Sequence, residues 1–205
     1  MKKFLKFAII CFASSAFLLV SCGKEEKDET PPVLSVPFID VSKIVNFISF
    51  GESLGEYENC NYEVRVNGLD TDVFSASAGV ITRISSNAAG KAGDPSQADF
   101  EISVQPSKNS IYTVIYDHVK NLPPNIVVGA SVAPGDRLGT VGHWSAGVGR
   151  TEFQINKTIS FKDHQDVSLC PHQFGTPAFN AAMEVACNNG HLFSTAVCMR
   201  ETVIP

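Results

Sequence analysis

Short segments of alternating apolar and polar residues fill the middle of the chain, between Tyr62 and Asn156. Each segment is rich in β-branched or aromatic residues and is bounded by glycine, proline, asparagine or aspartate, as expected of strands separated by turns. The segments are YEVRV, VFSASAGVITRISS, DFEISVQ, IYTVIYDHV, VVGASVAPGDRLGTVG and TEFQIN, at 62–66, 73–86, 99–105, 111–119, 127–142 and 151–156. Strands this short, at this spacing, favour an all-β sandwich or barrel over βαβ units.

The strand pattern loosens after Asn156. One later segment, AFNAAMEVAC at 178–187, has apolar residues at helical spacing and predicts a short helix that packs on the sheet. We therefore expect a β domain over 38–156, followed by a cysteine-containing extension over 157–205 that packs on this domain.

The N-terminus predicts a signal peptide over 1–21, because Lys2, Lys3 and Lys6 precede an apolar run that ends in small residues. The run closes with LLVSC, which resembles the processing box of bacterial lipoproteins and implies that Cys22 becomes the lipidated first residue. An ordinary secretory signal or an uncleaved helix is the alternative, but the apolar core is shorter than the roughly 20 residues that span a membrane. We expect a protein of the bacterial cell envelope, lipid-anchored to the outer membrane on its periplasmic or surface face.

Residues 22–37 are charged and then proline-bearing, so they predict a flexible tether between the lipid and the domain. Three of the 16 basic residues and none of the 21 acidic residues lie in the predicted signal peptide. The mature chain is therefore more acidic than the precursor. This balance argues against nucleic acid as a partner.

Four cysteines follow Cys22, namely Cys60, Cys170, Cys187 and Cys198. An even number in an exported chain predicts disulfides, with three possible pairings that the sequence does not separate. A zinc site is the alternative, but the chain contains no CxxC pair. All four cysteines are therefore disulfide candidates.

Three stretches carry a likeness to a known family: VFSASAGVITRI, YTVIYDHV and VVGASVAPGDRLGTVG. They resemble the strand-turn-strand, the segment ending in Tyr-x-His and the glycine-spaced hairpin of the lysostaphin-like, LytM-type zinc endopeptidases of bacterial cell walls. The likeness implies the duplicated hybrid motif fold and a zinc-dependent attack on wall peptides. Biotinyl and lipoyl carriers use a similar hairpin, but they need a modifiable lysine at its tip, and none stands here.

The residues that hold zinc in that family are replaced here. The family uses the His and Asp of an HxxxD motif and the second His of an HxH, and leaves the fourth position to the attacking water. The resemblance puts Asn59 and Glu63 at the first pair, Arg150 at the catalytic histidine of the HxH and Glu152 at its ligand. His118 alone survives as a catalytic histidine. With oxygen donors in place of imidazoles, no metal or other cofactor is expected.

Another alignment takes Asp70 as the metal aspartate and puts Val66 at the histidine. It requires a deletion and still lacks a histidine, so the interpretation is unchanged.

Arg150 and Glu152 lie two apart on a predicted strand and point to one face, where the family would place Glu63 beside them. Three interpretations follow. The charges could form a structural ion pair that fills the space of the metal, or a polar groove that binds peptide or glycan through Arg150, Glu63 and His118. A hard-cation site of Asn59, Glu63 and Glu152 is the third, although calcium prefers more oxygens.

His143 stands beside the only tryptophan, Trp144, in a segment that leads into this region. It is a candidate to stack on a ligand, and the alternative is a packing or surface role.

The hypothesis is an envelope lipoprotein with a degenerate LytM-type domain that does not cleave its ligand. It would bind cell-wall peptide or glycan, or regulate an envelope hydrolase. One alternative is an active variant metalloendopeptidase that cleaves peptidoglycan peptides and holds zinc. Another is a purely structural envelope protein, in which Glu63, His118, Arg150 and Glu152 would not cluster.

Overall fold

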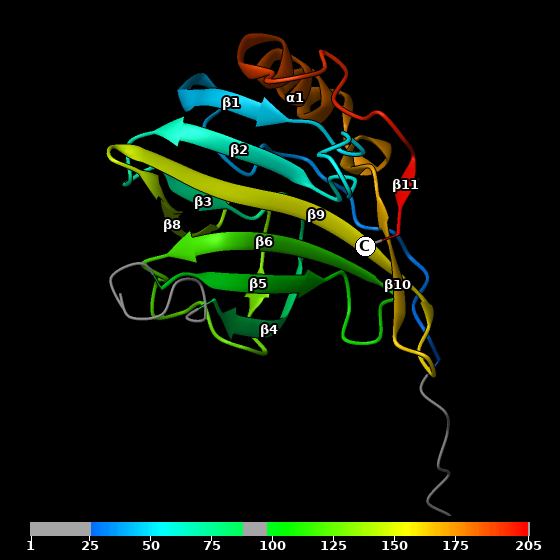
Figure 1. Cartoon of the computed structure of the whole chain (residues 1–205). Helices are drawn as coiled ribbons and strands as arrows, with labels where there is room; N and C mark the ends of the chain where they lie inside the picture. Colours follow the sequence, from blue (N-terminus) through cyan, green and yellow to red (C-terminus); the bar gives the residue numbers. More distant parts are fainter. Residues whose placement is uncertain (1–25, 88–97, 205) are drawn as a thin grey trace, which may run out of the picture.

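The computed structural model describes residues 26–87 and 98–204, which form one curved β-sheet with a helix against one of its faces (Figure 1). The predicted signal peptide and Cys22 lie outside the described residues. Within the described ranges, no helix is long and apolar enough to cross a membrane.

The strands are β1 (Ile44–Ile48), β2 (Tyr62–Asn67), β3 (Asp72–Phe74), β4 (Gly79–Ser86), β5 (Phe100–Gln105), β6 (Tyr112–Lys120), β7 (Ser131–Val132), β8 (Arg137–Ser145), β9 (Val148–Ser160), β10 (Gln165–Leu169) and β11 (Thr202–Val203). The helical elements are η1 (Val41–Lys43), η3 (Pro171–Phe174) and α1 (Pro177–Gly190).

The long strand β9 lies at the centre of the sheet. It pairs with β2 on one side, with β8 and β6 on the other, and with β10 near its end. All of these pairings are antiparallel, and the main path of the sheet runs β1-β2-β9-β8-β6-β5-β4-β7. Each part of β9 therefore places its side chains beside those of several neighbouring strands.

The all-β prediction is confirmed, and every segment predicted as a strand contains one. The strands form a connected open sheet and not a closed barrel. The sequence pattern missed β1, β10 and β11, which are short and lie outside the clearly alternating region. The boundary expected after Asn156 falls inside β9, because the extension continues the sheet through β10.

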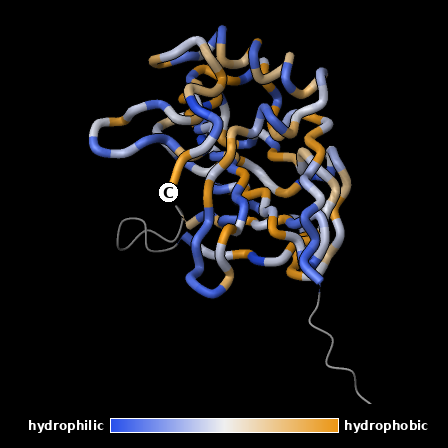
Figure 2. The backbone as a smooth tube through the Cα atoms, turned by 90° about the vertical axis from the view of Figure 1, so that its right-hand side faces the viewer, coloured by the Kyte–Doolittle hydropathy of each residue, from blue (hydrophilic) through white to orange (hydrophobic). Residues whose placement is uncertain are grey.

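One face of the sheet is apolar, and its side chains are buried in the core. Phe153 of β9 stacks on Phe38 with ring centroids 4.6 Å apart, and it also contacts Tyr116 and Phe179 at 5.3 and 6.1 Å. These rings are fully buried. Apolar and polar residues alternate along the strands in the tube of Figure 2, which places charged neighbours of the core residues on the opposite face.

The helix α1 covers the apolar face and confirms the predicted helix, three residues longer at its C-terminal end. Its N-terminus is capped by Thr176, whose hydroxyl accepts from the Phe179 amide, and Pro177 occupies the first turn. Phe179, Met183 and Ala186 are buried against the sheet. Because Phe179 packs on Phe153, the helix leaves the polar face of β9 uncovered.

The disulfide prediction is confirmed for one pair. Cys170 and Cys198 are bonded, and this bond ties the end of β10 to the C-terminal segment. Cys60 and Cys187 are free, so the expectation that all four would pair is wrong. Cys60 lies beside Gln154 on the polar face, whereas Cys187 is buried on α1 beside Ser49.

The segment before β1 packs on the domain. Asp28 donates its amide to Asn109, and Leu34 is fully buried and pairs with Gly175. This differs from the flexible tether expected over 22–37, because Leu34 and the nearby Phe38 carry enough apolar surface to be held by the core.

Candidate functional site

The strand β6 changes partners at His118. Before this residue it pairs with β9, from Tyr112 to Asp117, and after it with β8, through Val119 and Lys120. His118 itself has a positive φ of 56°, which is uncommon for a residue other than glycine and marks a local bend. The bend sets the imidazole between β5, β8 and β9, at the point where the sheet splits.

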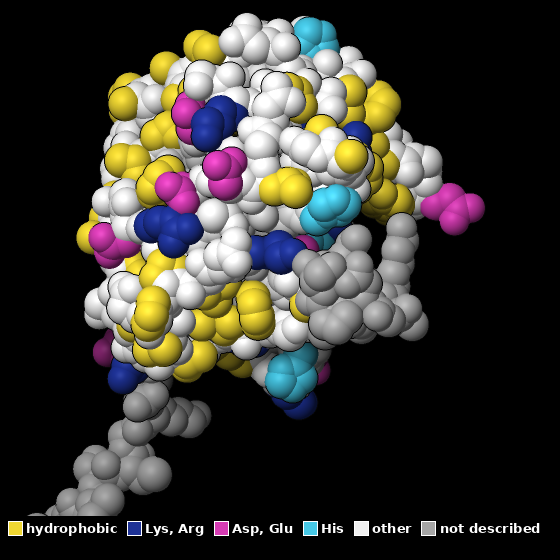
Figure 3. Space-filling model, turned by 90° about the vertical axis from the view of Figure 1, so that its left-hand side faces the viewer, with side chains coloured by type: hydrophobic (Ala, Val, Ile, Leu, Met, Phe, Trp, Pro, Cys, Tyr) yellow, Lys and Arg dark blue, Asp and Glu magenta, His cyan; other side chains and the backbone are white. Residues whose placement is uncertain are grey.

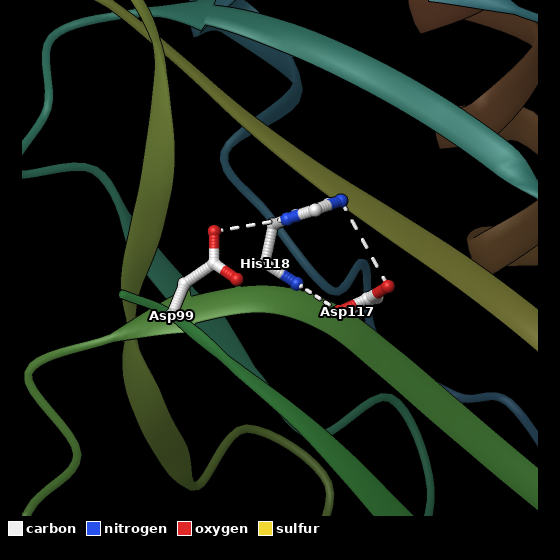
Figure 4. Close-up of side chains that lie close together, drawn as sticks. All are labelled: Asp99, Asp117 and His118. Carbon is white, nitrogen blue, oxygen red and sulfur yellow. Dashed lines mark hydrogen bonds and ion pairs between the residues drawn. The ribbon is translucent and has the colours of Figure 1, made fainter. Parts of the chain in front are cut away.

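Carboxylates approach both edges of the His118 ring. Asp99 Oδ2 lies 2.9 Å from Nδ1, while Asp117 Oδ2 and Glu152 Oε1 lie 3.8 and 3.4 Å from Nε2. Figure 4 shows Asp99 and Asp117 at opposite edges of the imidazole. Asn87 joins the two aspartates, because its side-chain amide donates to Asp99 at 2.9 Å and to Asp117 at 2.5 Å.

Arg150 and Glu152 complete this cluster from β9. The Arg150 guanidinium contacts His118 Nε2 through Nη2, and its Nη1 lies 4.0 Å from Glu152. Asn61, just before β2, donates to Glu152 Oε2 at 2.7 Å. We name Asp99, Asp117, His118, Arg150 and Glu152 the ionic cluster.

A glycine permits this close packing. A Cβ atom at Gly142 would lie 2.7 Å from Asp99 Oδ2, nearer than real Cβ atoms approach, and 3.0 Å from His118 Cβ, which is a tight contact. A side chain at this position would require Asp99 or His118 to shift. Gly142, on β8, therefore has a role in the packing of the site.

The opposite charges of the ionic cluster stabilise one another. Burial disfavours the charged form of His118, and the nearby Arg150 guanidinium also opposes it. Hydrogen bonds that the ring donates to Asp99 and Glu152 outweigh both effects and raise the pKa of His118 to about 9. Burial likewise opposes ionisation of Asp99 and Glu152, and their contacts with His118 lower the pKa of each below its ordinary value. At neutral pH, the Asp99 and Glu152 carboxylates thus flank an imidazolium.

The structure brings His118, Arg150 and Glu152 together, as the resemblance implied, but it separates Asn59 from them. Asn59 is buried, and its amide donates to the backbone carbonyls of Ser49 and Asn61 at 3.0 and 2.8 Å. Its expected place in a groove is wrong, because the loop before β2 uses this side chain to satisfy its own carbonyls.

Glu63 lies on the same face but forms its ion pair with Arg65, at 3.2 Å. The residue that donates to Glu152 from this side of β9 is instead Asn61, which directly precedes β2. Glu63 is directly opposite Glu152 across the strand pair, and two carboxylates in that position repel each other. Pairing with Arg65 relieves this repulsion.

His143 lies beside the cluster without joining it. It pairs with Gly149, one position away from the pair of Gly142 and Arg150, so its side chain points away from the Arg150 face. Its neighbour Trp144 faces Arg65 and Arg150 instead, with guanidinium carbons 3.9 and 5.2 Å from the ring centroid.

Sequence reasoning missed Asn61, Arg65, Asp99, Asp117 and Trp144 as members of this region. Asp99 directly precedes β5 and lies in no motif, and Asp117 occupies the variable position of the Tyr-x-His segment on β6. The sequence did contain a signal for Asn61 and Arg65. They lie two residues before and two residues after Glu63, so an extended chain places all three side chains on the same face. Figure 3 shows basic, acidic and histidine side chains close together on one side of the molecule, between apolar patches.

A zinc site needs donors that converge on one point about 2.0 to 2.2 Å from each ligand atom. The described residues offer one group, Asp99, Asp117 and His118, with ligand atoms all within 4.8 Å of one another. On the Nε2 side, the Arg150 guanidinium contacts the ring nitrogen. With Arg150 in this place, the residues do not fit a zinc ion bound at Nε2.

No family model matches the chain, and no curated protein matches it. Solved structures similar to it include Helicobacter pylori Csd3, at 17% identity and a TM-score of 0.42, over 61% of this chain and 30% of that protein. The catalytic domain of the prophage-encoded M23 protein EnpA from Enterococcus faecalis is similar at 17% identity, with a TM-score of 0.41, over 56% of this chain and 81% of that domain. Lysostaphin is similar at 16% identity, with a TM-score of 0.42, over 76% of this chain and 54% of lysostaphin.

Proposed function

We propose that this chain is a lipid-anchored protein of the bacterial envelope whose LytM-type β domain binds cell-wall peptide or glycan without hydrolysing it. The family assignment is supported by the three sequence motifs, which fall on β3 with β4, on β6, and on β7 with β8. Anchoring through Cys22 is supported by the lipoprotein-like segment LLVSC.

One observation carries the non-catalytic part of the proposal. The Arg150 guanidinium contacts His118 Nε2 and lies near Glu152, so an organic cation stands where a metal would have to bind both residues. A guanidinium supplies charge but has no open coordination position and cannot activate water as a metal ion does. The cluster is thereby suited to holding a ligand and not to cleaving it.

The polar face offers a surface for such a ligand. Besides the ionic cluster, it carries a small polar pocket of about 230 Å³. Residues that line this pocket are Thr82, Arg83, Ser103, Gln105, Thr113, Ile115, Asn156 and Asp166. Hydroxyl, amide and charged groups in this mixture suit the hydrogen-bonding groups of a peptide or a sugar.

The alternative is a variant metalloendopeptidase, and one observation favours it. Asp99, Asp117 and His118 bring their ligand atoms within 4.8 Å of one another. Displacement of Arg150 by substrate would then be needed before these residues could approach a metal.

Sedimentation with purified peptidoglycan sacculi tests the proposal directly. The full chain in detergent should sediment with sacculi, release no soluble fragments and contain no stoichiometric zinc by plasma mass spectrometry. Glu152→Gln should weaken binding, because it removes a charge that balances Arg150 and His118. Glu184→Gln is the matched control, since Glu184 pairs with His172 away from this face.

Stoichiometric zinc that is lost in Glu152→Ala, together with digestion of sacculi, would overturn the proposal in favour of the peptidase. A chain that neither sediments with sacculi nor digests them, but co-purifies with an envelope hydrolase, would redirect the proposal to regulation of that enzyme.

A further inference from the structure

We propose that Arg65, Arg150 and Trp144 form a platform that binds the free carboxylate of a peptide. This inference rests on the proposed function and deepens it, because it names the group of the wall peptide that the domain would recognise.

The first step is the register of two arginines. Arg65 on β2 lies directly opposite Arg150 on β9, so both side chains project from the polar face. Like charges in directly opposed positions destabilise a strand pair. Two guanidinium groups thus lie side by side on this face, and an anion placed between them would reduce their mutual repulsion.

The second step is the aromatic ring that orders them. Arg65 stacks on Trp144 at 3.9 Å from the centroid, and Arg150 lies at 5.2 Å. Stacking engages the flat face of a guanidinium and leaves its N–H edges available for hydrogen bonds. Trp144 is 42% exposed, so this edge of the sheet is accessible to a ligand.

The third step is the supply of unused donors. A guanidinium has five N–H groups, and Glu63, at 3.2 Å from Nη2, is the one hydrogen-bonding partner of the Arg65 side chain within the described part of the protein. The Arg65 Nε group has no partner there but is buried, so a ligand would have to bind the terminal nitrogens. Arg150 contacts His118 through Nη2, and its Nη1 is 4.0 Å from Glu152. Neither arginine is saturated by its neighbours.

A carboxylate fits this arrangement better than a phosphate group. Glu63 and Glu152 flank the arginines on the same face, and their charges oppose a dianion more strongly than a monoanion. The same glutamates would accept hydrogen bonds from the amide or ammonium groups of a peptide. A peptide that ends in a carboxylate matches both sets of groups, because guanidinium donors bind carboxylates in a fork.

Trp144 provides the measurement, since it is the only tryptophan of the chain. The full chain in detergent is titrated with a short stem peptide that ends in D-alanine with a free carboxylate, and with the same peptide amidated at that end. We expect the free acid to change Trp144 fluorescence and to bind at least tenfold more tightly than the amide. Inorganic phosphate should compete weakly.

Variants separate the platform from general effects of charge. Arg65→Gln should weaken binding of the free acid at least tenfold. Arg65→Lys keeps the positive charge and should retain part of the binding affinity, which shows that the protein tolerates a replacement at this position. Arg137→Gln is the matched control, because Arg137 pairs with Asp72 on β3, away from the platform, and it should bind as the parent does. Circular dichroism checks that each variant is folded.

Equal binding of acid and amide, no binding of either, or full binding by a folded Arg65→Gln chain would overturn the platform. Competition by phosphate as strong as that by the free acid would overturn the preference for a carboxylate. Sedimentation with sacculi separates this failure from that of the proposed function: if sedimentation persists while the acid and amide behave alike, wall binding stands and the platform falls.

Discussion

The two faces of β9 are held together by different forces. On one face, Phe153 lies among the rings of Phe38, Tyr116 and Phe179, all of them buried. On the other, Glu152 lies among Asn61, His118 and Arg150. Apolar packing is non-directional and involves no charge that changes with pH, whereas the ionic cluster depends on a balance of charges in which each member requires the others.

This difference separates the residues that hold the fold from those that carry the charges of the candidate site. Substitutions on the apolar face alter stability, because the packed core has no free volume to absorb them. On the polar face, Arg150 supplies a positive charge beside His118 and Glu152. Substitutions there change the balance of charges and leave the apolar packing in place.

The largest effect should come from the apolar face. Phe153→Ala removes the ring at the centre of the aromatic group and should lower the free energy of unfolding by about 3 to 5 kcal/mol. Urea unfolding followed by circular dichroism measures this loss. A loss below about 1 kcal/mol would show that the aromatic group is not the core of the sheet.

The ionic cluster should make stability depend on pH. The pKa of His118 rises from 6.5 to about 9 on folding, so its contribution is complete below pH 6.5 and is lost as the pH rises through 9. The loss should be about 2 to 3 kcal/mol in the free energy of unfolding. Urea unfolding between pH 6 and pH 10 measures it, and His118→Gln should flatten the decline. An equal slope in both proteins would contradict the charged histidine.

A smaller effect on the free energy of unfolding is expected at Gly142, where β8 packs against the ionic cluster. Gly142→Ala brings a methyl group against Asp99 and His118 and should cost about 1 to 3 kcal/mol in unfolding free energy. In an Asp99→Ala background the cost should shrink, because the nearest clash is gone. Thermal unfolding of the four proteins of this cycle measures the coupling. If the costs of the two substitutions simply add, the cost of Gly142→Ala does not come from its contact with Asp99.

The smallest effect should come from Gln154, which neighbours Phe153 but faces the polar side. Its amide donates to Asn156 and Ser168 at 2.6 and 2.9 Å. Gln154→Ala should cost about 1 kcal/mol or less, measured in the same urea experiment as Phe153→Ala. A cost equal to that of Phe153→Ala would remove the contrast between the faces.

Much of the fold could be predicted from local pattern. The alternating segments from Tyr62 to Asn156 all contain strands, and the helix starts at the Thr176 cap and Pro177. Strand β10 was not predicted, because it is short and largely polar and so shows no clear alternation of apolar and polar residues. Its existence depends on pairing with the end of β9, a non-local contact.

The site was predictable only in part. Arg150, Glu152 and His118 were placed by the resemblance, and they do meet. Asn59 and Glu63 were given roles in the groove, but Asn59 satisfies backbone carbonyls and Glu63 pairs with Arg65. Spacing along the chain sets the face on which a side chain lies, and does not set which of several neighbours on that face it contacts.

The sequence by itself determined which residues are apolar and which face of each strand they share, because alternation follows from the geometry of an extended chain. The resemblance added the prediction that Asn59 and Glu152 stand where the related peptidases have zinc-binding imidazoles. The tertiary structure decided that Asp99 and Asp117 flank His118, that Arg65 meets Arg150 beside Trp144, and that two of four candidate cysteines pair. These outcomes depend on distances between strands far apart in the chain, which arise only when the core closes and fixes the register.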